Sequence, residues 1–575
     1  MRAVRNPGLD GRLRIIRWGL FAAFLLYVSI RVFSVPLTND EFGALLSVYR
    51  GSLADLITFR IVDAQNHPLA AFCAILLRRF LPLGEIAAVR LPAVFGFLCF
   101  GLGALRATAR LNHPWLQVLG LAALLTNAFA LDFFSLARGY GLALGFQMLS
   151  LAFLIDLVCT RERPSHSSLR TQLALWCGCL AVISHLAFLS YFVGLIAMLF
   201  LLGFSLRGAL RESLRGGAAC DSPDLPPKKV WLSTVFHEVG RQGYLLVCGA
   251  LLAVFYLPIV IKLVAGDKLY FGGTRGWVAD SVSSLIDATF YRLDAPASVV
   301  TGLAYGLVIL GCLLGARQLV GFRAWRDLAR LRPAGVCFFL LAVMALFAYG
   351  LHLGFEVRFV LERAALILLP PAVCLFLFAT DDLSGRFQEV LFLLLTVYVL
   401  VGASQLNLRR TLSWEMTADA PQLVADLAAL REAQGGGPLV LGISDSCKTT
   451  TWYYLNELLS KEKEPKLTDK GLVRITDWLA LYPINLQPVV NTSIKVPTAS
   501  EAERAGFQYW LPVDPREGGD SGEERVWLHR DTDYLLVRDG HGLDQYPWPA
   551  EKVKDYIESR TTLLRLRWPT GGLTG

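Results

Sequence analysis

Long apolar runs recur through the first 407 residues, separated by shorter polar stretches. A helix that crosses a bilayer needs roughly 20 predominantly apolar residues, because each residue rises about 1.5 Å through a hydrocarbon core about 30 Å thick. The pattern therefore predicts an α-helical polytopic membrane protein with about 11 transmembrane helices. The predicted spans are 15–35, 91–110, 115–134, 139–159, 171–188, 189–206, 242–264, 298–320, 335–354, 363–380 and 387–407.

Two apolar stretches do not fit as single spans. Residues 68–83 contain Arg78 and Arg79 side by side, and two charges near the middle of a span would cost roughly 5–7 kcal/mol. We therefore predict an interfacial helix on the membrane surface in the first outer loop. Residues 172–206 would form one helix about 50 Å long, which exceeds a single crossing. A break near Ser184-His185 would divide this stretch into two spans.

Beyond residue 407 the pattern changes to short runs with a denser charge and no segment of span length. Alternating helix-like and strand-like pieces predict a small soluble α/β domain. We thus predict two domains, a transmembrane domain at 1–407 and the α/β domain at 408–575. The helix-like pieces are 420–433, 450–460 and 553–560, and the strand-like pieces are 438–443, 525–529 and 534–537.

Composition narrows the class of protein. The chain is 54% hydrophobic and only 18% charged, which excludes an ordinary soluble enzyme. The chain carries a formal charge of +8, but it has no basic patch interleaved with aromatic residues. No nucleic-acid partner is therefore expected. Nearly all the cysteines fall inside apolar runs, where cysteine packs as a small apolar side chain.

The distribution of Lys and Arg predicts the orientation in the membrane. With eleven crossings, one side receives the arginine-rich N-terminus and the basic stretches at 106–110, 161–170, 207–241 and 317–332. By the positive-inside rule this side is the cytoplasm. Outward-facing parts are then 36–90, 132–140, 265–297, 355–362 and the C-terminal domain. We expect a multi-pass protein of the plasma (inner) membrane, with a cytoplasmic N-terminus and an extracytoplasmic, periplasmic C-terminal domain.

This topology gathers ionisable and aromatic residues on the outer face. They are Asp40, Glu41, His67, Arg90, Asp132, Arg138, Tyr140, His185, Lys268, Arg358 and Arg363. Carboxylates beside Arg and His suit an anionic lipid headgroup and a nearby proton-accepting acid. Each residue also has a purely structural interpretation: the arginines at helix ends as snorkelling side chains, Asp132 as a turn residue, His185 as a packing residue. Their joint placement on one side favours a functional site.

An ordered series of motifs resembles the GT-C glycosyltransferases, especially the protein O-mannosyltransferases and the bacterial lipid A aminoarabinose transferase group. The series is Asp40-Glu41 after the first span, His67-Pro68-Leu69, Val89-Arg90-Leu91-Pro92-Ala93, the Gly101–Arg110 end, Ala137-Arg138-Gly139-Tyr140 and Ser184-His185. The resemblance covers about the first 205 residues well and the later spans only in pattern. Two departures affect the substrate class: Leu69 replaces the second proline of the usual His-Pro-Pro, and the Arg-Gly-Tyr series varies.

The resemblance implies a membrane glycosyltransferase of the cell envelope. Such an enzyme takes a hexosyl or pentosyl group from a polyprenyl-phosphate donor, usually with inversion, and transfers it to a glycan, lipid or protein acceptor on the outer face. Asp40 matches the acid that activates the acceptor hydroxyl, and Glu41 completes the catalytic pair as its supporting neighbour. The resemblance implies no cofactor firmly. A divalent metal ion is left as an alternative, for which Asp132 or Glu356 could serve as a second outward acid.

Arg138 matches a family position near the donor phosphate. From topology, further candidates for phosphate binding are Arg358, Arg363, Lys268 and His185. Candidates for acceptor binding or loop support are His67, Asp132, Arg90 and Tyr140.

Three alternatives stay open from the sequence. A transporter or flippase for a lipid-linked sugar would bind near the bilayer midplane, often through inverted repeats; no convincing repeat is found, and the ionisable residues gather at one face. A metal-dependent oligosaccharyltransferase would be distinguished by the metal dependence of its activity. An anchor or sensor acting through the C-terminal domain would tolerate the loss of Asp40.

Overall fold

The computed structural model describes most of the first 435 residues and mainly the strands beyond them. The described ranges are 7–45, 48, 52–57, 67–80, 82, 84–159, 164–216, 243–244, 247–252, 254–262, 272–290, 296–319, 331–435, 439–444, 454, 466–467, 473–474, 479–484, 507–512, 525–529, 534–538, 550–556 and 561–566. The chain divides into two compact units. The membrane unit comprises Met1–Val32 and Ala44–Leu406, and the C-terminal unit comprises Phe33–Gly43 and Asn407–Gly575.

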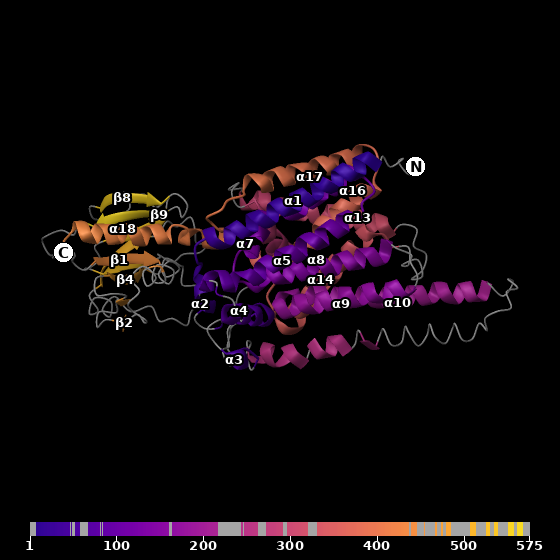
Figure 1. Ribbon diagram of the computed structural model, residues 1–575, viewed down its shortest axis with the longest axis horizontal. Helices are drawn as coiled ribbons and strands as arrows, with labels where there is room; N and C mark the ends of the chain where they lie inside the picture. The colour runs from indigo at the N-terminus through magenta and orange to yellow at the C-terminus, as the bar shows by residue number, and fades with distance from the viewer. Residues whose placement is uncertain are drawn as a thin grey trace. The chain divides into compact units, whose positions relative to one another are not determined.

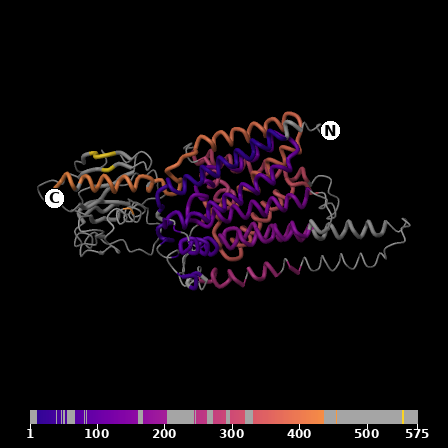
Figure 2. The backbone as a smooth tube through the Cα atoms, viewed as in Figure 1, coloured from indigo at the N-terminus to yellow at the C-terminus, as the bar shows by residue number. Residues whose placement is uncertain are grey.

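The membrane unit is built from helices, the longer of which run roughly side by side (Figure 1). These helices are α1 (Pro7–Ser34, whose last residues enter the C-terminal unit), α3 (Leu53–Ile57), α4 (Pro68–Phe80), α5 (Glu85–Thr108), α6 (Pro114–Leu125), α7 (Ala128–Phe134), α8 (Gly139–Cys159), α9 (Pro164–Ser184), η2 (Leu186–Phe188), α10 (Leu189–Gly216), η4 (Val278–Val282), α12 (Ser283–Thr289), α13 (Ala297–Leu319), α14 (Pro333–Phe355), α15 (Glu362–Ala365), η6 (Leu366–Leu368), α16 (Leu369–Asp382) and α17 (Arg386–Ser404). The backbone trace in Figure 2 follows the same arrangement.

The described helices confirm a helical multi-pass membrane protein. Seven are long and apolar enough to cross a membrane: Gly11–Ser34, Glu85–Thr108, Gly139–Cys159, Ala297–Gln318, Pro333–Phe355, Glu362–Asp382 and Arg386–Ser404. The predicted span 115–134 is the pair α6 and α7, bent by 61°. The other three predicted spans coincide with shorter apolar helices at Ser168–Ser184, Leu186–Leu202 and Val247–Lys262. The total of eleven crossings stays a prediction.

Helices in the structure correspond to both of the apolar stretches that do not fit as single spans, residues 68–83 and 172–206. Residues 68–80 form α4, which buries Ala71 and Ala74 and pairs Arg78 with Glu85 at 3.1 Å. Its position at the membrane surface stays a prediction. The break near Ser184-His185 is confirmed, because α9 ends at Ser184 and α10 begins at Leu189 after the short helix η2.

Helices α5 and α8 pack through a seam of glycines. A Cβ added at Gly96 would collide with the backbone of Gly141, and one added at Gly145 would collide with the backbone of Gly96. A Cβ at Gly103 would lie only 2.8 Å from the carbonyl oxygen of Met148. Small residues let transmembrane backbones approach closely, so that van der Waals contact holds them together. The seam fixes α8, whose first residues belong to the candidate site.

The C-terminal unit contains the short helix α2 (Asn39–Ala44), whose last residue lies in the membrane unit, together with η7 (Leu412–Thr417) and α18 (Ala420–Ala433). Its described strands are β1 (Leu439–Ser444), β2 (Lys466–Leu467), β3 (Val473–Arg474), β4 (Leu479–Ile484), β5 (Phe507–Pro512), β6 (Arg525–His529), β7 (Tyr534–Arg538), β8 (Ala550–Tyr556) and β9 (Thr561–Leu566). Seven of them form a mixed sheet in the order β2-β3-β4-β1-β7-β9-β8, with β1 parallel to both β4 and β7. Strands β5 and β6 form a separate antiparallel pair.

One secondary-structure prediction in the tail is wrong. Residues 553–560 were expected to be helical, but the stretch up to Tyr556 belongs to β8. Strand β8 is the last in the sheet and pairs antiparallel with β9. Here strand pairing overrides local helix propensity, and Lys554 is charged as is common on edge strands. The helix at 420–433 and the strands near 438–443, 525–529 and 534–537 are confirmed. The helix at 450–460 lies outside the described residues except at Tyr454.

Candidate functional site

Three residues from distant parts of the membrane unit form one buried aromatic cluster. His67 directly precedes α4, Tyr140 lies in the first turn of α8, and His185 lies between α9 and η2. The ring centroids of Tyr140 and His185 are 3.8 Å apart, and those of His67 and His185 are 4.5 Å apart. All three side chains are buried. We call this group the histidine cluster.

Gly139 explains how the motifs can meet so closely. A Cβ at this position would collide with the carbonyl oxygen of Ser184 and lie 2.7 Å from Cβ and Cγ of His67. A side chain larger than hydrogen therefore cannot fit without moving one of these neighbours. The start of α8 is pressed against both histidine-bearing segments, and the glycine of the Arg-Gly-Tyr series is required for this contact.

The charges around the cluster are cationic. Burial lowers the pKa of the His67 imidazole well below its usual value, so the ring is neutral at pH 7. His185 and the positive charges of Arg138 and Arg363 lower this pKa further, which places both guanidinium groups within electrostatic range. Arg138 is buried in the turn before α8, and Arg363 is half-buried in α15. Two guanidinium groups beside neutral imidazoles favour a bound anion.

Hydrogen bonding assigns the proton on one imidazole. The backbone N–H of Ala187 donates to Nδ1 of His185 at 3.1 Å. Nδ1 then carries no hydrogen, so neutral His185 bears its proton on Nε2 and can donate it. Nε2 of His67 is buried and has no hydrogen-bond partner among the described residues. Each imidazole thus retains a nitrogen for a hydrogen bond to a ligand.

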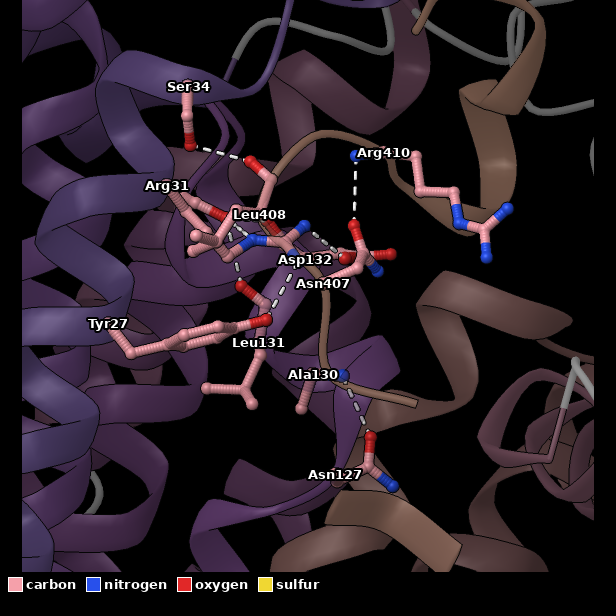
Figure 3. Close-up of polar contacts among 11 residues, drawn as sticks. Tyr27, Arg31, Ser34, Asn127, Ala130, Leu131, Asp132, Asn407, Leu408 and Arg410 are labelled. Atoms are coloured by element: carbon pink, nitrogen blue, oxygen red, sulfur yellow. Dashed lines mark hydrogen bonds and ion pairs between the residues drawn. The ribbon is translucent and has the colours of Figure 1, made fainter. Parts of the chain in front are cut away.

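Asp132 has an ionic partner that sequence reasoning missed. Nη2 of Arg31, near the end of α1, contacts Oδ1 of Asp132 at 2.5 Å, and both side chains are almost fully buried (Figure 3). Arg31 also donates from Nε to Ser135 at 3.1 Å and from Nη1 to the hydroxyl of Tyr27 at 3.1 Å. This network ties α1 to α7. Asp132 was expected to support the acceptor or serve as a second acid; the contact adds a structural role, and the expected roles stay predictions.

Arg90 also ties α1 to a neighbouring helix. Its guanidinium is fully buried in α5 and donates from Nη1 to the carbonyl oxygen of Val32 at 2.9 Å. A snorkelling arginine would keep its charge in water, so that interpretation does not apply. Val32 is the last residue of the membrane unit before the segment that bears Asp40; a role of Arg90 in loop support stays a prediction.

In the C-terminal unit, the acidic pair separates into two environments. The backbone N–H of Thr38 donates to Oε2 of Glu41 at 3.1 Å, and the N–H of Glu41 donates to Oγ1 of Thr38 at 3.3 Å. This reciprocal arrangement is a capping box, which satisfies two free donors at the start of α2. Glu41 is buried, with 1% of its surface exposed, whereas Asp40 is half-buried in the first turn. Glu41 therefore braces the turn of α2 in which Asp40 lies.

Arg358 and Lys268 are the remaining candidates for phosphate binding. Arg358 is exposed, next to Phe359, whose backbone exchanges two hydrogen bonds of 2.9 Å with Gly273. Lys268 lies outside the described residues. Glu356, the other proposed second acid, is exposed at the end of α14. In the part of the chain that the structure describes, no group of three His, Cys, Asp or Glu side chains could hold a metal ion.

Comparisons with known proteins return structural likenesses only. No family model matches the chain, and no curated protein matches it. Among solved structures, ArnT from Cupriavidus metallidurans bound to undecaprenyl phosphate is 13% identical, with 95% of this chain and 97% of that chain covered and a TM-score of 0.39. The oligosaccharyltransferase AglB from Archaeoglobus fulgidus, in complex with an inhibitory peptide and a dolichol-phosphate, is 11% identical, with 90% and 69% covered and a TM-score of 0.36. Because these TM-scores are low, the functional argument rests on the residues of this chain.

Two missed features had signals in the sequence. Arg31 is a single charge near the end of an apolar run, and an ionisable residue inside a span calls for a buried partner. Thr38 and Glu41 stand at the Thr-x-x-Glu spacing of a capping box. The pairing of Arg31 with Asp132 specifically had no such signal, because it depends on how α1 packs against α7.

Proposed function

We propose that this protein transfers a sugar from a polyprenyl-phosphate-linked donor to an acceptor on the outer face of the membrane. The observation that carries the proposal is the convergence of three distant motifs, His67-Pro68, Arg138-Gly139-Tyr140 and Ser184-His185, on one buried cluster. The same motifs in the same order carry the resemblance to GT-C glycosyltransferases. The neutral imidazoles and the two guanidinium groups that act on them supply hydrogen-bond donors and positive charge, which suit an anionic ligand.

The histidine cluster and its arginines are the proposed binding groups for the donor phosphate. Arg138 and Arg363 supply positive charge, and His185 can donate from Nε2. As the sugar leaves, negative charge grows on the phosphate oxygen, and preorganised cationic donors stabilise that charge. Lys268 and the exposed Arg358 remain further proposed phosphate contacts. Tyr140 and His67 shape the cluster.

Asp40 is the proposed catalytic acid/base. The acceptor oxygen attacks the anomeric carbon of the sugar, its proton passes to the Asp40 carboxylate, and the bond from the anomeric carbon to the phosphate oxygen breaks. The bonding electrons stay on the phosphate, so the products are the glycosylated acceptor and the polyprenyl phosphate. A single displacement inverts the anomeric centre. The half-buried Asp40 side chain is accessible for this role, and Glu41 holds the helix on which it lies.

The test is a transfer assay with the purified protein in lipid vesicles. Labelled polyprenyl-phosphate hexoses and pentoses are offered with glycan, lipid and protein acceptors, and the label in each acceptor is measured. We expect transfer from one donor class. Movement of the donor across the bilayer without transfer would instead indicate a transporter. Loss of transfer with a chelator, restored by Mg²⁺ or Mn²⁺, would favour the metal-dependent oligosaccharyltransferase.

Arg138 offers a specific check on the donor site. Replacing Arg138 with Ala removes a charge-assisted hydrogen-bond donor worth about 1.5–3 kcal/mol, and the apparent affinity for the lipid-linked sugar should fall by about tenfold to a hundredfold. Arg138→Lys should restore part of this loss. The matched control is Arg78→Ala, which removes a partly exposed ion pair with Glu85. Unchanged donor affinity in Arg138→Ala would contradict the phosphate assignment.

A further inference from the structure

We infer that the C-terminal unit positions Asp40, and that Tyr454 is the positioning residue. The inference rests on the proposed function, which assigns the acid/base role to Asp40. It gives the C-terminal unit a part in positioning the group that is proposed for the chemical step.

The segment that carries Asp40 groups with the C-terminal unit rather than with the helices that flank it in sequence. Residues Phe33–Gly43 form one compact unit with Asn407–Gly575. Two described hydrogen bonds make this link. Oγ of Ser34 donates to the carbonyl oxygen of Leu408 at 2.5 Å (Figure 3). The backbone N–H of Leu37 donates to the hydroxyl oxygen of Tyr454 at 2.7 Å, across a sequence separation of 417 residues.

The bond to Tyr454 lies two residues before α2 begins at Asn39. Leu37 is fully buried, so its N–H needs a partner within the protein, because a buried unpaired donor costs about 1–3 kcal/mol. Phenylalanine would fill the same space as Tyr454 but has no oxygen to accept this bond. The hydroxyl is therefore the part of the side chain that fixes the position of the Leu37 backbone.

The chain between Leu37 and Asp40 is short and internally braced. Thr38 follows Leu37 directly and forms the capping box with Glu41, through bonds of 3.1 and 3.3 Å. A third bond runs from Oγ1 of Thr38, which donates to Oε2 of Glu41 at 3.2 Å. Asp40 lies inside this braced turn of α2. A displacement of Leu37 is therefore passed on to the Asp40 carboxylate, rather than being absorbed by a flexible loop.

The experiment compares Tyr454→Phe with wild type in the full-length protein, with polyprenyl-phosphate sugar as the donor. Loss of one hydrogen bond should lower kcat by about threefold to tenfold, while KM for the donor stays unchanged because the donor groups lie in the membrane unit. Hydrogen exchange gives a readout that does not depend on activity. The peptide spanning residues 33–44 should lose protection in Tyr454→Phe, and adding Ser34→Ala should increase both effects.

The matched control is Asp426→Asn, which removes a surface ion pair with Lys554 (2.7 Å) in the same unit. It should change neither kcat nor the exchange of residues 33–44. Unchanged protection or wild-type kcat in Tyr454→Phe, alongside an inactive Asp40→Asn variant, would overturn the positioning role alone. A rise in donor KM equal to the fall in kcat would overturn it as well. Wild-type turnover by Asp40→Asn would overturn the acid/base role of Asp40, and the positioning role with it.

Discussion

The histidine cluster and the Asp40 segment are held in place by different means. The cluster joins residues from three helix ends of the membrane unit, and close packing around Gly139 leaves its members little room to move. Asp40 lies on a six-residue helix of the C-terminal unit, where a local capping box and the bond to Tyr454 fix it. The proposed donor-binding groups and the proposed acid therefore belong to separate compact units. Substitutions in the histidine cluster should change donor affinity, and substitutions in the Asp40 segment should change turnover.

The largest expected effect is that of Asp40→Asn on turnover. General base catalysis contributes about 10²–10⁴-fold, so kcat should fall by that order while donor affinity stays near wild type. Asparagine keeps the size of the side chain, so the turn of α2 is preserved. Single-turnover transfer and donor binding measured on the same preparation test this separation. A parallel loss of donor binding would contradict the division of roles between the two units.

Breaking the Arg31–Asp132 pair should destabilise the membrane unit. Removing one partner leaves a buried charge uncompensated, which costs about 3–5 kcal/mol. Arg31→Met alone should therefore lower the thermal unfolding temperature strongly. The double variant Arg31→Met with Asp132→Leu should recover much of the loss, because neither charge then remains.

The partly exposed pair of Arg78 and Glu85 provides the control for the Arg31–Asp132 pair. Its single variants should cost less than about 1 kcal/mol. If Asp132→Asn instead abolished transfer while the unfolding temperature stayed at the wild-type value, Asp132 would have a chemical role rather than a structural one.

Gly139→Ala tests whether close packing positions the cluster. The added methyl group would overlap Ser184 and crowd His67, and overpacking costs about 1–3 kcal/mol. We expect weaker donor binding, with kcat at saturating donor less affected. Gly19→Ala is the matched control, since no heavy atom lies within 4 Å of its added Cβ. Equal effects of the two substitutions would contradict the packing argument.

The smallest expected effect is that of Glu41→Gln, which distinguishes the role of Glu41 from that of Asp40. Glutamine can replace glutamate in a capping box, so Glu41→Gln should retain most of its turnover. Glu41→Ala removes the reciprocal bond to Thr38 and should cost about 0.5–2 kcal/mol of stability. Turnover of Glu41→Gln as low as that of Asp40→Asn would show that Glu41 acts in the chemistry itself.

The sequence predicted the features that depend on local pattern. Hydropathy located the helices, and the length argument located the break at Ser184-His185, because both follow from the thickness of a bilayer. The sequence predicted that His67 and His185 lie on the same outer face, but it did not predict the contact between them. Its geometry depends on Gly139, whose role is visible only once α8 is packed.

The remaining features depend on contacts between distant segments. The partner of Asp132 required knowing that α1 lies against α7, and the strand at 550–556 depends on pairing with β9. The grouping of residues 33–43 with the C-terminal unit also has no local signal, since its bond from Leu37 reaches Tyr454. Hydrophobic periodicity carries no information on such long-range pairs.

The glycine seam between α5 and α8 also bears on motion during a reaction cycle. Gly96, Gly141 and Gly145 bring the backbones of α5 and α8 into close contact, and this contact would be lost if either helix slid or rotated against the other. We therefore expect these two helices to move as one rigid body when donor binds and product leaves. Distances between spin labels on α5 and α8 should be the same in both states. Any opening that admits a long polyprenyl chain would then have to arise from displacement of other helices, so this pair is a natural frame of reference for measuring it.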